Sequence, residues 1–195
     1  MPRLNDEQRR VLLLPVNKRR VLVAQGQSHL PAYDVIAYLN RVFGIEFWSR
    51  EIMSTWLIHE TAEDKNGRIG WTVTYGCKVR LTIRNPEGEI VKTSDGVATG
   101  SANNLPSRGD AHDFAIKNAD SYALKRAAKD LGDQFGLSLY NRGSIEPVVR
   151  ASVAYGEIQN DEALRDPIPQ SLGNDERAEP DAPVSLADAI RKATA

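Results

Sequence analysis

Alanine recurs at every fourth position between residues 111 and 127 of this 195-residue chain. The positions are Ala111, Ala115, Ala119, Ala123 and Ala127. In an α-helix this spacing places the alanines on one narrow stripe, and a stripe without bulky side chains can lie very close to a flat neighbour. Leu131 and Phe135 continue the apolar pattern, so the sequence predicts a long amphipathic helix over residues 112–140 that covers a sheet.

The most regular strand pattern lies between residues 71 and 84. Apolar and polar residues alternate there, which predicts a strand with one core face and one basic face. The core face carries Trp71, Val73, Tyr75, Cys77, Val79, Leu81 and Ile83. The other face carries Lys78, Arg80 and Arg84. An Asn66-Gly67 turn before this strand favours positive φ and predicts a hairpin with the preceding strand.

The remaining elements are predicted from local signals. Asn5 opens a short helix that Pro15 ends, and a second helix runs from Pro31 to Phe43, with Gly44 at its end. Strands are expected over residues 46–58 and 89–98, followed by a polar loop over residues 99–110. The order indicates an α+β fold, an antiparallel β-meander packed against a long α-helix.

Composition divides the chain into a basic body and an acidic tail. Residues 1–160 carry 21 basic and 18 acidic side chains, whereas residues 161–195 carry four basic and eight acidic ones. We expect one domain over residues 1–150 and a tail over residues 151–195. Residues 161–183 have the composition of a disordered segment. Residues 184–193 are consistent with either a frayed end or a short helix that docks a partner.

The sequence predicts no enzyme. His29, His59 and His112 lie at no metal-ligand spacing, and no phosphate-binding glycine loop occurs, so we expect no metal and no cofactor. Acidic pairs such as Asp130/Asp133 and Glu87/Glu89 are the best candidates for a metal-dependent nuclease, and that interpretation is disfavoured because they lie on a helix surface and in a turn. The single cysteine, Cys77, excludes an intrachain disulfide. No apolar run of signal or membrane-spanning length is present, from which we expect a cytoplasmic protein without membrane contact.

Three basic groups could follow the phosphates of a nucleic acid. They are Lys125, Arg126 and Lys129 on the long helix, Lys78, Arg80 and Arg84 on the strand, and Arg19 or Arg20 in the basic segment before Val21. Periodicity alone fits a solvated charged surface equally well, because exposed helix and strand faces commonly carry lysine and arginine. The aromatic residues Trp48, Trp56, Trp71 and Tyr75 are expected in the core or at a subunit interface.

Four short segments carry a family resemblance. They are AIKNA at residues 115–119, ALKRA at 123–127, FGLSL at 135–139 and VIAYLNRVFGIEFW at 35–48. The order of these segments along the chain and the spacing between them resemble the Rad52/Rad22 family of single-strand annealing proteins, of a phage or bacterial type. The resemblance covers the chain from about residue 4 to residue 142. Tyr122 stands where many members have an acidic residue.

The resemblance implies a function. Such proteins bind single-stranded DNA and promote ATP-independent annealing of complementary strands in homologous recombination and double-strand break repair, and they form homo-oligomeric rings. The resemblance implies that Lys125 and Arg126 bind the DNA backbone. It also implies that Lys78 and Arg80 lie on one wall of the DNA-binding groove, and that Arg19 or Arg20 contacts DNA at the inner of two DNA sites. Arg108 would lie near a second, outer site. The place of action would be the cytoplasm of a prokaryotic or phage-infected cell, at the nucleoid.

Two other classes of function stay open. An RNA-binding module with strands and a covering helix would show the same cations and prefer duplex RNA. A non-enzymatic adaptor or mediator ring would act through its acidic tail and bind no nucleic acid. The tail is also the expected contact for a recombinase or a single-strand-binding protein, or a competitor of DNA.

Overall fold

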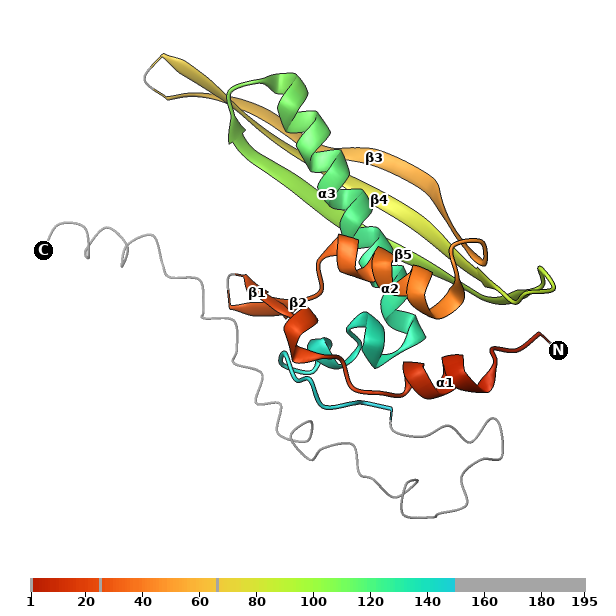
Figure 1. Ribbon diagram of the computed structural model, residues 1–195. Helices are drawn as coiled ribbons and strands as arrows, with labels where there is room; N and C mark the ends of the chain where they lie inside the picture. Colours follow the sequence, from red (N-terminus) through yellow and green to blue (C-terminus); the bar gives the residue numbers. More distant parts are fainter. Residues whose placement is uncertain (1, 25, 66, 150–195) are drawn as a thin grey trace, which may run out of the picture. The chain divides into compact units, whose positions relative to one another are not determined.

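A three-stranded antiparallel sheet and one long helix form the larger part of the fold (Figure 1). The computed structural model describes residues 2–24, 26–65 and 67–149. The strands follow one another as a meander in the order β3-β4-β5, and α3 lies across one face, which confirms the predicted α+β class. Their bounds are β3 Trp48–Lys65, β4 Arg68–Arg84, β5 Ile90–Leu105 and α3 Arg108–Ala128.

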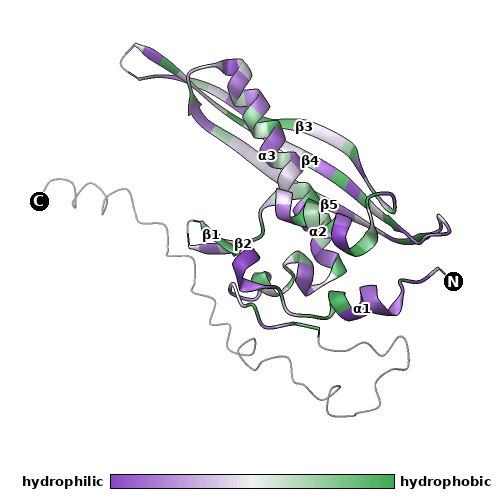
Figure 2. Ribbon diagram, in the orientation of Figure 1, coloured by the Kyte–Doolittle hydropathy of each residue, from purple (hydrophilic) through white to green (hydrophobic). Residues whose placement is uncertain are grey.

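The alanine stripe lets α3 lie almost in contact with the sheet backbone. All five alanines are buried, and two glycines of β5 lie under them. A Cβ added at Gly100 would lie 2.2 Å from the backbone nitrogen of Ala119, and one at Gly96 would lie 2.1 Å from the carbonyl oxygen of Ala123. No larger side chain fits at this distance. Figure 2 shows α3 in mixed colours, because polar residues alternate along the helix with the alanines of its buried stripe.

A second core lies beyond the end of α3. Helices α1 (Asp6–Leu12) and α2 (Ala32–Phe43) pack there with three short 3₁₀ turns, η2 (Lys129–Leu131), η3 (Asp133–Phe135) and η4 (Ser138–Tyr140). Asn5 caps α1 by accepting a hydrogen bond from the backbone N–H of Gln8, as its position predicted. Val35, Leu39 and Phe43 form the buried face of α2, whereas Ile36 is 36% exposed.

Three predicted boundaries are wrong. The strand expected over residues 46–58 continues to Lys65. The long helix ends at Ala128 rather than at Tyr140, because the chain turns at Gly132, whose φ is 118°, and continues as 3₁₀ turns that return Phe135 and Leu139 to the core. The segment expected as a polar loop over residues 99–110 is mostly strand, since β5 continues to Leu105. The side of this segment that faces α3 carries the small residues Gly100 and Ala102. Because it has no large apolar side chain, the alternation that predicts a strand was absent from the sequence.

The two faces of the sheet differ as the alternation in β4 predicted. Val73, Cys77 and Val79 are fully buried beneath α3, while the opposite side, which we call the open face, carries Lys78 and Arg80. The aromatic residues do not behave alike. Trp48, Trp71 and Tyr75 are partly buried against the core, whereas Trp56 is 41% exposed and lies over Gly76 on the open face.

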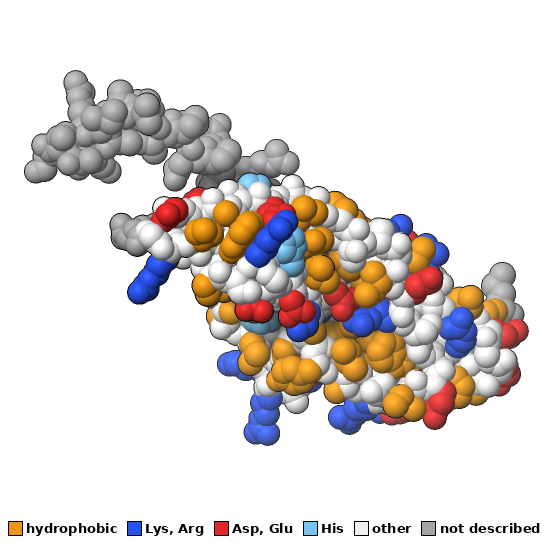
Figure 3. Space-filling view, turned by 90° about the horizontal axis from the view of Figure 1, so that it is seen from above, with side chains coloured by type: hydrophobic (Ala, Val, Ile, Leu, Met, Phe, Trp, Pro, Cys, Tyr) orange, Lys and Arg blue, Asp and Glu red, His pale blue; other side chains and the backbone are white. Residues whose placement is uncertain are grey.

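Strand β3 is a largely exposed edge strand. Large apolar side chains at about half of their full exposure lie along it, namely Ile52, Met53, Trp56, Leu57 and Ile58. Figure 3 shows hydrophobic side chains on one face of the molecule, interspersed with acidic and basic ones. Such an edge presents unpaired backbone groups to another chain.

The predicted disordered segment and terminal helix of the tail lie outside the described residues. Within those residues, no helix has the length and apolar character needed to cross a membrane.

Candidate nucleic-acid interface

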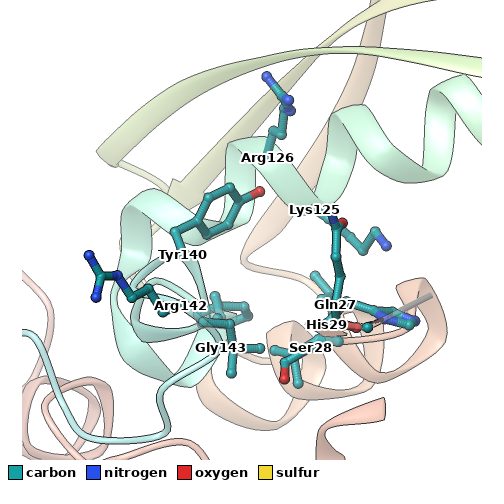
Figure 4. A pocket seen from close by; sticks show the side chains of 14 residues that line it. Gln27, Ser28, His29, Lys125, Arg126, Tyr140, Arg142 and Gly143 are labelled. Carbon is teal, nitrogen blue, oxygen red and sulfur yellow. Dashed lines mark hydrogen bonds between the residues drawn. The ribbon is translucent and has the colours of Figure 1, made fainter. Parts of the chain in front are cut away.

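Two adjoining hollows beside the last turns of α3 form one groove. Their volumes are about 570 Å³ and about 450 Å³. Both are lined by Gln27, His29, Lys125, Arg126 and Tyr140. Figure 4 shows Tyr140 and Arg142 on one side and Lys125 with Gln27 and His29 on the other, while the side chain of Arg126 extends from α3 away from these residues. We call this region, with Ala98 and Thr99 of β5 at one end and Gly143 at the other, the groove.

Besides Ala98 and Thr99 of β5, three segments far apart in the sequence form the groove. The first is the small hairpin of β1 (Leu22–Ala24) and β2 (Gln27–His29), which turns at Gly26 with a φ of 74°. The second is the end of α3, and the third is the chain from Phe135 to Gly143. The last turn of α3 carries Lys125 and Arg126, where the negative end of the helix dipole favours cations.

The groove contains no carboxylate among the residues that the structure describes. In that same part of the chain, neither Lys125 nor Arg126 forms an ion pair. Partial burial lowers the pKa of Lys125 from its ordinary value. A half-buried lysine without an acidic partner has a desolvation cost that an incoming anion relieves. The groove is therefore electrostatically suited to phosphate groups.

Lys129, the third predicted helix cation, does not line the groove. Its Nζ lies 3.3 Å from a carboxylate oxygen of Asp130 and 5.4 Å from the centre of the Tyr140 ring. It is therefore beside the groove, with its charge partly balanced by its neighbour.

Lys78 and Arg80 lie on the open face, away from α3. Both pair with Asp95 of β5, at 3.0 Å and 2.7 Å respectively. These two cations hold the pKa of the Asp95 carboxyl far below its ordinary value, and the hydrogen bonds to Asp95 raise the pKa of Arg80. The structure does not bring them together with Lys125 and Arg126 within one chain, because the sheet separates the two sets.

Arg19 and Arg20 have different surroundings although they are adjacent. The guanidinium of Arg20 donates to both carboxylate oxygens of Asp34, with a shortest distance of 2.8 Å, and to the side chain and backbone oxygens of Gln134. It also lies 3.7 Å from the centre of the Tyr38 ring. Arg19 is exposed. Arg20 thus fastens η1 (Lys18–Arg20) to α2 and η3, and Arg19 is the one available to a ligand.

Arg108 lies at the opposite end of α3 from the groove. Its Nε donates to Glu60 at 2.7 Å, and its guanidinium lies 5.2 Å from the Trp71 ring. His112 and Arg108 share Glu60, and the hydrogen bond from Arg108 is the main cause of the lowered pKa of that carboxyl. About 17 residues at 1.5 Å each separate Arg108 from Lys125, so the two belong to different surfaces.

Several groove residues were missed in the sequence. Gln27, Ser28 and His29 belong to a hairpin too short for a periodic pattern. Tyr140 lies in a 3₁₀ turn that was expected to be helix, and Arg142 lies in a turn just beyond the predicted helix. The one available signal was the Gly26 turn between two short segments. No cluster of three or more metal-ligating side chains occurs in the described part of the chain.

A groove that carries lysine and arginine and has no carboxylate among its described residues is the electrostatic feature expected where a protein holds a nucleic-acid backbone. Residues 14–157 match the Rad52/22 family of double-strand break repair proteins, so the chain belongs to that family. Proteins of this family act in DNA repair and recombination and are generally not enzymes.

Three fungal relatives show the extent of the similarity. The chain is 27% identical over 139 residues to the DNA repair and recombination protein rti1 of Schizosaccharomyces pombe, which is 71% of the chain and 35% of that relative. It is 26% identical over 115 residues to the rad22 protein of the same species, 59% of the chain and 23% of the relative. It is 33% identical over 103 residues to the DNA repair protein RAD59 of Eremothecium gossypii, 50% and 47% respectively. The chain spans less than half of the length of each relative.

Proposed function

We propose that the domain binds single-stranded DNA in the groove and promotes ATP-independent annealing of complementary strands in homologous recombination and double-strand break repair. The observation that carries the proposal is the pair Lys125 and Arg126, placed in a groove without carboxylates and without an ion pair in the described part of the chain. Neutralising the phosphates of one strand lowers the repulsion that opposes the approach of its complement.

A homo-oligomeric ring is part of the proposal. The exposed edge of β3, with its row of apolar side chains, supports pairing between subunits. A closed ring would repeat the groove around its circumference, so that modest binding by each subunit becomes strong in sum. Arg19 is proposed as a further DNA contact, because its side chain is exposed whereas that of Arg20 is partly buried and paired with Asp34. Lys78, Arg80, Lys129 and Arg108 stay predicted DNA contacts outside the groove.

The annealing assay tests the proposal directly. Two complementary oligonucleotides are mixed without ATP, one of them pre-incubated with protein, and duplex formation is compared with the spontaneous rate at low and moderate salt. We expect acceleration that falls as salt rises. The variant Lys125→Ala/Arg126→Ala should lose most of this acceleration while its oligomeric state, measured by light scattering, is unchanged.

Lys117→Ala is the matched control. Lys117 lies on the same helix, is exposed and pairs with Asp113, so its removal should leave annealing close to the parent rate. If the double variant anneals like the parent, the groove is not the DNA site. Preference for duplex RNA in competition with single-stranded DNA would favour an RNA-binding module. Absence of binding to either would favour an adaptor that acts through the tail.

The tail and the origin of the chain belong to the same proposal. Residues 151–195 are proposed to contact a recombinase or a single-strand-binding protein, or to compete with DNA, because residues 161–195 carry a net negative charge. A phage or bacterial origin, with action in the cytoplasm at the nucleoid, stays a prediction to which the fungal relatives add no support.

A further inference from the structure

Two exposed tyrosines line the groove beside its cations. Tyr122 is 46% exposed and Tyr140 is 64% exposed, and both belong to the hollow that contains Lys125 and Arg126. Neither tyrosine is part of a buried cluster in the described part of the chain. Since burying an aromatic ring would stabilise the fold, two rings left at the surface of one groove require another explanation.

Each ring is accompanied by a lysine. The Nζ of Lys125 lies 4.5 Å from the centre of the Tyr122 ring, and the Nζ of Lys129 lies 5.4 Å from the centre of the Tyr140 ring. A cation at one side of a ring restrains its orientation and leaves the rest of the ring surface available. Each exposed ring of the groove therefore has a lysine next to it, Lys125 within the groove and Lys129 beside it.

The hydroxyl groups do not explain these positions. In the part of the chain that the structure describes, neither the Tyr122 nor the Tyr140 hydroxyl forms a hydrogen bond, whereas Tyr75 bonds to His112. The feature that both tyrosines offer to a ligand in the groove is therefore the flat aromatic ring. Single-stranded nucleic acid requires both features that occur here, cations for its phosphates and flat surfaces on which bases stack irrespective of sequence.

We propose that Tyr122 and Tyr140 are stacking platforms for the bases of the single strand whose phosphates Lys125 and Arg126 hold. The inference rests on the proposed function and adds to it that the groove recognises bases as well as charge. A small number of bases in each subunit is held against protein, and the remaining bases stay free to pair. The grip is independent of sequence because every base has a π-face.

Oligonucleotides without bases separate the two contributions. Fluorescence anisotropy compares the full chain bound to an oligothymidylate with the chain bound to an equally long strand of abasic tetrahydrofuran residues, which keeps the phosphates. The parent should prefer the base-bearing strand by at least about fivefold, the low end for one stacked base. Tyr122→Leu/Tyr140→Leu should reduce this preference, with affinity for the abasic strand and its salt dependence unchanged. Tyr122→Phe/Tyr140→Phe should keep the preference, because it retains both rings.

The outcomes distinguish this inference from the proposed function. Lys125→Ala/Arg126→Ala should weaken binding of both strands, since it removes phosphate contacts. Equal affinity of the parent for the two strands, or an equal loss of both in the leucine variant, overturns the stacking role and leaves annealing untouched. A change in the oligomeric state of the leucine variant also overturns it, because the rings would then serve subunit contacts. Binding of neither strand by the parent refutes the proposed function itself.

Discussion

The two basic pairs of the domain differ in what surrounds them. Lys78 and Arg80 on the open face share the carboxylate of Asp95, whereas Lys125 and Arg126 in the groove have no acidic partner among the described residues. Both pairs look alike in sequence, as cations on an amphipathic element. The comparison teaches that the number of cations on a surface is a poor measure of its affinity for anions, because an intramolecular carboxylate already satisfies one pair and not the other.

The adjacent residues Arg19 and Arg20 also differ in this way, since Arg20 is paired and Arg19 is exposed. Their comparison gives the largest expected effect, which is on the stability of the fold. Arg20→Ala removes a partly buried ion pair and leaves Asp34 and Gln134 without their donor, so we expect a loss of about 3 kcal/mol in the free energy of unfolding. Arg19→Ala should leave stability unchanged, because its side chain is exposed. Urea denaturation followed by circular dichroism measures both. Equal stability of the two variants would show that the Arg20 contacts are not important for the fold.

The second prediction compares the two basic pairs directly. Lys125→Ala/Arg126→Ala should weaken binding of single-stranded DNA by tenfold or more and flatten the dependence of log K on log salt by about 1.4, the value for two phosphate contacts on a single strand. Lys78→Ala/Arg80→Ala should change affinity by less than about threefold, since Asp95 already balances much of that charge. Anisotropy titrations over a series of salt concentrations give both numbers. A larger loss from the sheet pair would reverse the assignment.

The sequence alone did not predict which of the two basic pairs has an acidic partner. The alanine stripe and the alternation in β4 predicted the helix, the sheet and the face between them, because both signals are local and periodic. The partner of Arg80 is Asp95, which lies opposite it only in the register that β4 and β5 adopt. The hairpin residue His29 and the turn residue Tyr140 meet Lys125 through tertiary packing. Their spacing in the chain carried no periodic signal for this meeting.

Asp95→Asn is the third prediction and removes the difference between the two pairs. Without the carboxylate, Lys78 and Arg80 become available to anions, so DNA affinity should rise by about threefold at low salt and return to the parent value at higher salt. Anisotropy at two salt concentrations measures the change. Asp120→Asn is a matched control, because Asp120 pairs with Arg50 on the side of the sheet that faces α3. An equal gain in both variants would reflect net charge rather than the open face.

The smallest expected effect concerns the stability cost of Lys125. Burial lowers the pKa of Lys125, so the unfolded chain holds this proton to higher pH than the folded one does. The charged lysine therefore opposes folding below its folded pKa, and this cost decreases as the pH rises from there toward the ordinary lysine value. Lys125→Met keeps the length of the side chain without its charge and should raise Tm by about 2 °C near neutral pH while lowering DNA affinity.

Two comparisons test whether this cost is specific to the half-buried lysine. The gain in Tm should shrink in alkaline buffer, as the pH rises toward the ordinary lysine pKa and the folded parent loses this proton before the unfolded chain does. Arg126→Met should lower DNA affinity without raising Tm, because Arg126 is exposed and has no comparable desolvation cost. Differential scanning calorimetry at both pH values provides the measurement. A lower Tm for Lys125→Met with unchanged DNA binding would mean that Lys125 supports the fold, and the groove would then lack the unsatisfied cation on which its affinity for phosphate depends.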